Sequence, residues 1–301
     1  MISNQMNINS AYILEDRGIL FVDGADAKDF LQNIITNDIN KVSDAKSCFA
    51  SLLTPQGKFL FDFLVIKHKK GYFLDCEKIQ IDELFKQLSL YKLRSNIQIL
   101  NLSNEFVVAA LSYEKFKSLK SSEDELGFTI RYEEDPILLD PRNKKLGARL
   151  VINLEKLYLS LKKLDLKSSK LEEYYNLSFD LGILQNNTNK LKDKIFGIEC
   201  NFEELNAINF KKGCYVGQEN TSRIKLRNKL RRRILPVKKI VGEISENDII
   251  KYKGSEIGKV IISTPYSFAL VKVVEPDLNE FTNTELICGT SKVKILKPEW
   301  I

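Results

Sequence analysis

The stretch KKGCYVGQEN is the part of the chain whose residue types and spacing could do chemistry. Lys212 stands two positions before Cys214, and a nearby ammonium favours the thiolate, the reactive form of cysteine. Gly213 and Gly217 allow a tight backbone path that could bring amide groups or a ligand close. The same loop carries three further side chains that could contact a ligand, a flat ring, an amide and a carboxylate: Tyr215, Gln218 and Glu219.

The residues alone leave two interpretations of Cys214 open. Free cysteines are among the most buried residues, so a small apolar residue packed in a core is the more common outcome. The alternative is a working thiol in a built site. The five cysteines are scattered, no C-x-x-C occurs, and His68 is the single histidine. The sequence therefore predicts neither a zinc site nor a self-contained iron–sulfur site, and no metal ligands are assigned.

A basic segment, RIKLRNKLRRR (223–233), follows the loop, and seven of its eleven residues are Lys or Arg. Charged and mostly apolar residues alternate from Arg223 onward, which predicts an extended strand with one basic face. A solvated strand face is one interpretation. The other is an electropositive wall beside a site for a carboxylate- or phosphate-bearing ligand. Nucleic-acid contact is a weaker expectation, because the segment is short and aromatic residues do not interleave with it.

Helices and strands interleave in the elements that must position this loop. Apolar spacing predicts a helix from Ala27 with Asp26 as its cap, a second helix from Ile81, and a helical stretch over 155–182 that stops at Gly182. Strands are predicted at 19–22, 47–53, 59–67 and 71–76 and in NIQIL and FVVAAL. This order indicates an α+β fold with mixed or antiparallel sheets.

The composition and the spacing of the strands indicate the class of protein and its division into two parts. The chain has 301 residues, 44% hydrophobic and 29% charged, with a net charge of +6 that favours an anionic ligand or partner. No apolar run is long enough to cross a bilayer, and the polar N-terminus does not read as a signal peptide, so we expect a cytoplasmic protein. Six short strands after residue 230 predict a small antiparallel barrel, which divides the chain into 1–230 and 231–301.

The eight residues KGCYVGQE resemble the signature of the YgfZ family of folate-binding proteins. These are relatives of the glycine-cleavage T-protein that are implicated in iron–sulfur cluster assembly or maintenance. Arg223 falls where the family usually has an arginine, and the resemblance extends in order over further segments: 24–39, 52–65, 91–99, 140–150 and 253–263. It implies ferredoxin-like and related α+β modules around a central cavity, followed by a six-stranded barrel.

The resemblance implies an accessory protein that binds tetrahydrofolate or a one-carbon derivative and supports iron–sulfur enzymes or cluster-assembly proteins. Cys214 would be a reactive thiol at the wall of the central cavity, with Lys212 and the basic strand favouring its thiolate. Asp180 occupies the place of the T-protein glutamate that holds the pterin. The remaining folate-binding candidates are Asp62, Tyr215, Gln218, Glu219 and Arg223.

Two departures from the family pattern leave alternatives open. Ser178 stands where the family usually has an arginine, which weakens the expected folate site. Phe61-Asp62 provides one carboxylate where the T-proteins have paired aspartates, which speaks against the first alternative, a true aminomethyltransferase. The second alternative is a non-catalytic interaction scaffold, which would need no working thiol at Cys214.

Overall fold

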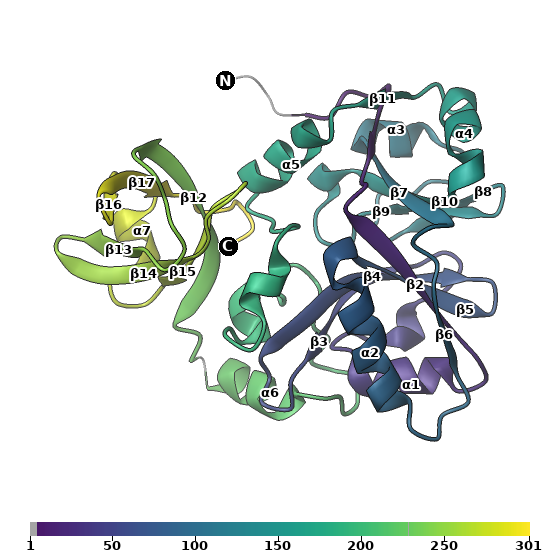
Figure 1. Ribbon diagram of the computed structural model, residues 1–301, viewed down its shortest axis with the longest axis horizontal. Helices are drawn as coiled ribbons and strands as arrows, with labels where there is room; N and C mark the ends of the chain where they lie inside the picture. The colour runs from purple at the N-terminus through teal and green to yellow at the C-terminus, as the bar shows by residue number, and fades with distance from the viewer. Residues whose placement is uncertain (1–4, 228) are drawn as a thin grey trace.

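The computed structural model describes residues 5–227 and 229–301. Their strands form two β-sheets and a closed barrel (Figure 1). The first sheet is antiparallel, with the order β3–β4–β5–β2–β6, and its strands are β2 (Arg17–Asp23), β3 (Cys48–Leu53), β4 (Phe59–His68), β5 (Gly71–Glu77) and β6 (Gln98–Asn101). Two helices share an apolar cluster with it: α1 (Ala27–Ile34) and α2 (Ile81–Lys92). In α1 the buried residues recur at helical spacing, Ala27, Phe30, Leu31 and Ile34, which confirms the predicted helix there.

The second sheet has the order β11–β1–β7–β10–β9–β8 and pairs β1 in parallel with β11. Its strands are β1 (Ser10–Ile13), β7 (Phe106–Leu111), β8 (Thr129–Tyr132), β9 (Asp135–Leu139), β10 (Ala148–Asn153) and β11 (Lys167–Ser169). The helices that follow along this part of the chain are α3 (Tyr113–Ser118), α4 (Leu157–Lys163) and α5 (Leu171–Asp180). The mixed α+β architecture predicted from the sequence is confirmed.

The barrel lies to one side of the two sheets in Figure 1 and follows α6 (Gln218–Leu226). Within residues 229–301 its strands close in the order β12–β15–β14–β13–β16–β17, which confirms the predicted six-stranded antiparallel barrel. The elements are β12 (Arg232–Val241), β13 (Ile249–Tyr252), β14 (Ser255–Ile262), β15 (Phe268–Lys272), α7 (Leu278–Phe281), β16 (Leu286–Cys288) and β17 (Ser291–Ile295). The Trp300 indole N–H donates to the Leu181 carbonyl at 2.8 Å and ties the chain end to the turn after α5.

Three local predictions were wrong. The stretch 155–182 is not one helix, because α4 ends before Asp165, which has φ +54°, and the edge strand β11 separates it from α5. The segment 223–233 is not one strand, because its first residues are the last turn of α6 and β12 begins only at Arg232. Asp26 does not cap α1 with its side chain, which instead accepts from the backbone N–H of Asn96 at 2.7 Å.

A buried network of charges joins the two sheets. Arg149 of β10 donates to Asp75 of β5, and Arg17 of β2 donates to the same carboxylate at 2.7 Å. Burial alone would raise the pKa of Asp75, but the two guanidinium groups outweigh it and hold that pKa below its ordinary value. The stabilisation is therefore complete above the ordinary pKa of aspartate and is lost as pH falls through the lower, folded-state pKa.

The network continues toward the centre of the molecule. Arg142 donates twice to the Asp140 carboxylate, at 2.9 Å and 2.7 Å. Gln185 accepts from both Arg142 and Arg149 through its side-chain carbonyl oxygen. Because these groups are almost completely buried, each depends on its partners for compensation of lost hydration.

We predict that Asp75→Asn lowers the free energy of unfolding by about 3–5 kcal/mol, because it leaves two guanidinium groups buried without their carboxylate. Urea denaturation monitored by circular dichroism measures the change. The control is Glu133→Gln, which removes an exposed ion pair with Lys163 and should leave the midpoint unchanged. Equal midpoints for Asp75→Asn and wild type would show that the network does not hold the sheets together.

Candidate functional site

Lys212 anchors the KGCYVGQE loop to the end of helix α1. Its ammonium donates to the backbone carbonyls of Gln32, Ile35 and Asn37 at 2.6, 2.6 and 2.9 Å. These bonds use all three donors of a lysine and satisfy carbonyls that a helix end leaves unpaired. Burial lowers the pKa of Lys212 to about 8. The geometry thus gives Lys212 a positioning role, and its predicted effect on the Cys214 thiol stays a prediction.

Two glycines pack the loop against the β3–β4 hairpin, backbone to backbone. Gly217 has φ +84°, and a Cβ there would lie 2.5 Å from the carbonyl oxygen of Thr54. Gly57, at the hairpin tip, has φ +81°, and its Cβ would lie 3.1 Å from the carbonyl oxygen of Gly217. The Asn220 side chain adds a hydrogen bond of 3.0 Å to the carbonyl of Gln56. The loop therefore has a fixed path, which holds the neighbouring Cys214 in place.

Cys214 is exposed and lies in an open surface groove of about 880 Å³. Three sequence segments that are far apart along the chain line it: Pro55 from the hairpin, Tyr91 from the end of α2, and residues from the loop through α6. The expectation that Cys214 lies at the wall of the central cavity was wrong, because Cys214 lines this open groove and is not among the residues that line the central cavity. Gly213 faces open space, since no atom lies within 4 Å of a Cβ built there.

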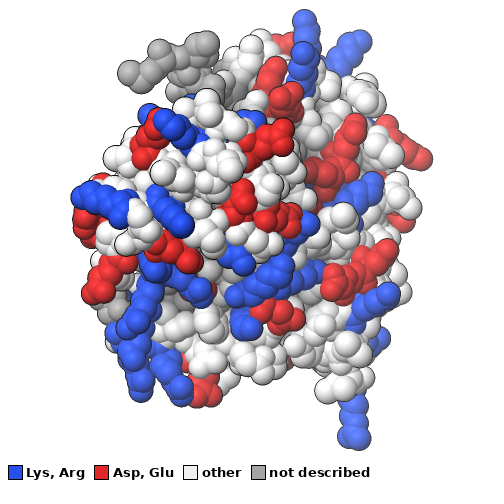
Figure 2. All heavy atoms as spheres, turned by 60° about the vertical axis from the view of Figure 1, so that its left-hand side comes forward, with Lys and Arg blue, Asp and Glu red and all other residues white. Residues whose placement is uncertain are grey.

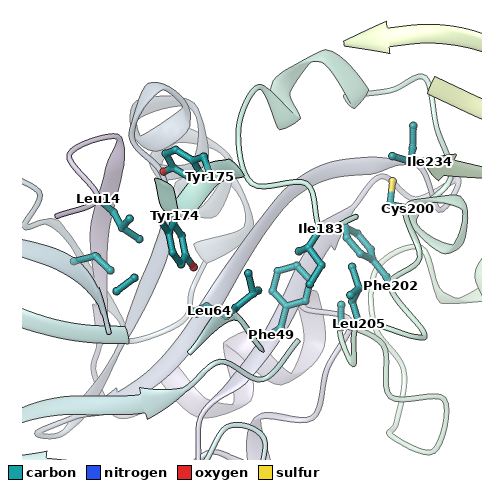
Figure 3. Packing of buried hydrophobic residues seen from close by; sticks show 14 of the residues in the cluster. Leu14, Phe49, Leu64, Tyr174, Tyr175, Ile183, Cys200, Phe202, Leu205 and Ile234 are labelled. Carbon is teal, nitrogen blue, oxygen red and sulfur yellow. The ribbon is translucent and has the colours of Figure 1, made fainter. Parts of the chain in front are cut away.

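The other four cysteines differ from Cys214 in burial. Cys76, Cys200 and Cys288 are buried and Cys48 is half-buried. Burial raises the pKa of Cys48 to about 12 and that of Cys288 to about 11, and it also raises the pKa of Cys200. These thiols are therefore held in the unreactive protonated form. Figure 3 shows Cys200 packed near Ile234 and Phe202.

The structure separates the predicted site residues into groups. Cys214 and four of the predicted ligand residues line the groove: Tyr215, Gln218, Glu219 and Arg223. Within this group Arg223 donates to Glu219 at 2.7 Å, one turn apart on α6. Asp62 instead lines the central cavity, and Asp180 is exposed at the end of α5. Ser178 in the same turn is buried, and it donates to the carbonyl of Ile183 at 2.6 Å.

The central cavity does not fit tetrahydrofolate. Its volume is about 20 Å³, room for roughly one water molecule, whereas sites for such ligands measure roughly 300–1,000 Å³. Apolar side chains fill the space, and Figure 3 shows Phe49, Phe202, Ile183 and Leu205 directed toward one another. The rings of Phe49 and Phe202 meet edge to face with centroids 5.7 Å apart. Asp180, which was expected to hold the pterin, is exposed and lies outside this cavity.

Sequence reasoning named Asp62 but missed Arg142, the cation that lines the same central cavity. Arg142 lines it together with Asp62, whose pKa is raised by burial against the opposing charges of Arg17 and Arg142. The segment 140–150, which begins Asp-Pro-Arg, was part of the family resemblance, but no function was assigned to its residues from the sequence. A signal was present, since Asp140 and Arg142 are two residues apart and form a local ion pair. Their burial between the sheets depended on the tertiary structure.

In 5–227 and 229–301, no group of three or more His, Cys, Asp or Glu side chains could hold a metal ion. Over the same residues, no helix has the combined length and apolar character needed to cross a membrane.

The chain is similar to curated iron–sulfur cluster assembly factors. A mitochondrial IBA57 homologue of Dictyostelium discoideum is 28% identical over 264 residues, covering 79% of this chain and 64% of the relative. The Neurospora crassa homologue is 27% identical and covers 91% and 61%, and the mouse factor is 26% identical and covers 76% and 66%. The chain thus spans about three fifths of the length of the first two relatives. No family model matches it.

The fold is that of a glycine cleavage aminomethyltransferase. The crystal structure of aminomethyltransferase T from Bartonella henselae superposes with a TM-score of 0.75 at 14% sequence identity, covering 99% of this chain and 88% of that one. This likeness includes both the α+β region and the barrel, as the resemblance predicted. At this identity it establishes the architecture alone.

We predict that Gly217→Ala destabilises the protein by roughly 1–3 kcal/mol, because a Cβ there would clash with the Thr54 carbonyl in a left-handed backbone. The matched control is Gly213→Ala, which meets no atom within 4 Å and should melt like wild type. Thermal unfolding followed by circular dichroism compares the two. Similar losses at both glycines would mean that the packing against Gly57 does not fix the loop.

We predict that tetrahydrofolate shows no saturable binding in calorimetric titration, since the cavity holds about one water molecule and Asp180 lies outside it. Asp180→Ala should give the same trace as wild type. Saturable binding that disappears in Asp62→Ala would instead show that the cavity opens and receives the folate.

Proposed function

We propose that this chain is an accessory factor in iron–sulfur cluster assembly and that Cys214 is its working thiol. The observation that carries the proposal is the exposed Cys214 in a groove built by three separate sequence segments. The curated relatives, which are named as iron–sulfur cluster assembly factors, support the same process.

The proposed role of Cys214 is to supply one thiolate ligand to iron. Iron–sulfur clusters are held by cysteine thiolates, four in the common cluster types. Cys76, Cys200 and Cys288 are buried, and the described residues contain no group of three ligands. A cluster at Cys214 therefore requires its remaining ligands from a partner protein or a small thiol. Such shared ligation suits transient handling of a cluster rather than its permanent storage.

The groove geometry suits this role. The loop is fixed by Lys212 and by the Gly57–Gly217 packing, so its backbone needs little further ordering when the thiol binds a ligand. The open space beside Gly213 allows a second molecule to approach the backbone next to the thiol. A partner carrying a cluster could therefore reach Cys214 without rearrangement of the loop.

Aminomethyl transfer has less support despite the shared fold. Phe61 packs in the cluster beneath α1 and α2, on the opposite side of β4 from Asp62. The cavity beside Asp62 leaves room for neither a folate nor the arm of a carrier protein. The family resemblance implies tetrahydrofolate binding, but the small central cavity speaks against it, and no step of the proposed function depends on it.

We predict that Cys214→Ala and Cys214→Ser both abolish support of iron–sulfur enzymes in cells that lack the endogenous relative, because neither side chain supplies a thiolate. Complementation, with activity of an iron–sulfur enzyme as the readout, measures this. Both variants should melt like wild type, since an exposed thiol contributes little packing.

Cys48→Ala is the matched control for loss of a thiol outside the groove, and it should complement. Timed labelling with iodoacetamide and peptide mapping should modify Cys214 before the buried thiols. Full complementation by Cys214→Ala would refute the proposed role and favour the scaffold alternative.

A further inference from the structure

The basic segment 223–233 carries more positive charge than its neighbours neutralise. Four of its seven basic side chains form ion pairs with glutamates, and these are Arg223 with Glu219, Lys225 with Glu203, Arg232 with Glu199, and Arg233 with Glu204. The other three, Arg227, Lys229 and Arg231, are exposed and make no ion pair with the described part of the chain. On the face that Figure 2 shows, basic side chains gather at the lower left, while both signs mix elsewhere.

The three unpaired cations connect two grooves on either side of α6. Arg227 lines the Cys214 groove. Lys229 and Arg231 line a second groove of about 610 Å³ between the end of α6 and the barrel. Each of the two grooves therefore carries positive charge that no described acidic side chain pairs.

Apolar side chains line the same two grooves. Leu226, at the end of α6, lines the Cys214 groove with 85% of its surface exposed. Val274 lines the second groove at 55% exposure, beside Leu230 and Ile224. An exposed leucine or valine of this kind is stabilised when a partner removes it from water, by about 25 cal/mol for each Å² buried. Each groove therefore combines an exposed apolar side chain with positive charge.

We propose that this surface, defined by Arg227, Lys229, Arg231, Leu226 and Val274, binds a partner protein through an acidic segment with interspersed apolar side chains. The carboxylates would neutralise the three cations, and the apolar side chains would cover Leu226 and Val274. Such docking places the partner beside Cys214, so the inference rests on the proposed function and adds the chemistry of its partner. The exposed Leu226 and Val274 favour a protein over a nucleic acid, because a phosphate backbone offers no apolar side chains to cover them.

The test uses fluorescence anisotropy with a defined probe. The probe is a fluorescein-labelled peptide that repeats Glu-Leu-Asp-Phe, and its neutral counterpart repeats Gln-Leu-Asn-Phe. The full chain is compared with a variant in which Arg227, Lys229 and Arg231 are replaced by Glu. The matched control replaces three exposed lysines with Glu at the opposite end of the molecule in Figure 1, near α3 and α4: Lys117, Lys120 and Lys162.

Wild type and the control variant should bind the acidic peptide equally, and the Arg227/Lys229/Arg231 variant should bind it at least roughly tenfold more weakly. Binding should weaken with added salt, and the neutral peptide should bind more weakly than the acidic one. Equal binding by all three proteins, no binding by wild type, or tighter binding of a poly-dT oligonucleotide than of the acidic peptide at the same salt would overturn the proposal.

Complementation separates this proposal from the one on which it rests. The Arg227/Lys229/Arg231 variant should lose support of iron–sulfur enzymes, whereas the Lys117/Lys120/Lys162 variant should retain it. If Cys214→Ala fails and the Arg227/Lys229/Arg231 variant complements fully, the docking surface is wrong and the proposed function stands. If Cys214→Ala complements while peptide binding follows the expected order, the proposed function is wrong and the surface stands.

Discussion

The buried contact between Arg149 of β10 and Asp75 of β5 is the interaction on which the placement of the two sheets depends. Ion pairs out of water are costly to form, and removal of one partner leaves the other charge buried without compensation. Here Arg17 shares the carboxylate, and Gln185 links Arg149 to the pair of Arg142 and Asp140. The network has specific partners, so it fixes one arrangement of the sheets where apolar contact alone would allow sliding.

The fixed first sheet determines where Cys214 lies. β5 is the neighbour of β4, whose hairpin with β3 presents Gly57 at its tip. Gly217 packs on that tip, and Lys212 binds the carbonyls at the end of α1, which covers the same sheet. The end of α1 therefore holds the loop at Lys212, and the hairpin tip holds it at Gly217. Cys214 lies between these two contacts and is exposed. The rigid scaffold thus carries an exposed thiol on a loop, an arrangement that is common at binding sites.

The chain shares the aminomethyltransferase architecture, but its central cavity is too small for a large ligand. The superposition extends over 99% of the chain, yet the central cavity is filled by side chains such as Phe49 and Phe202. A filled cavity stabilises the fold through packing but removes a ligand site. The surface groove offers an alternative, because it holds the exposed thiol together with the exposed Arg227. One architecture can thus serve different chemistry through changes in a few cavity and loop residues.

The sequence by itself determined the elements whose patterns are local. The apolar spacing of α1, the hairpin around Gly57 and the strands of the barrel each follow from neighbouring residues, and the signature identified the loop of Cys214. Only the tertiary structure decided that 155–182 divides around Asp165, that the basic segment begins as a helix, and that Asp62 and Cys214 lie at separate sites. The physical reason is that these outcomes depend on contacts between residues far apart in sequence, as when β11 pairs with β1 or Gly217 meets Gly57.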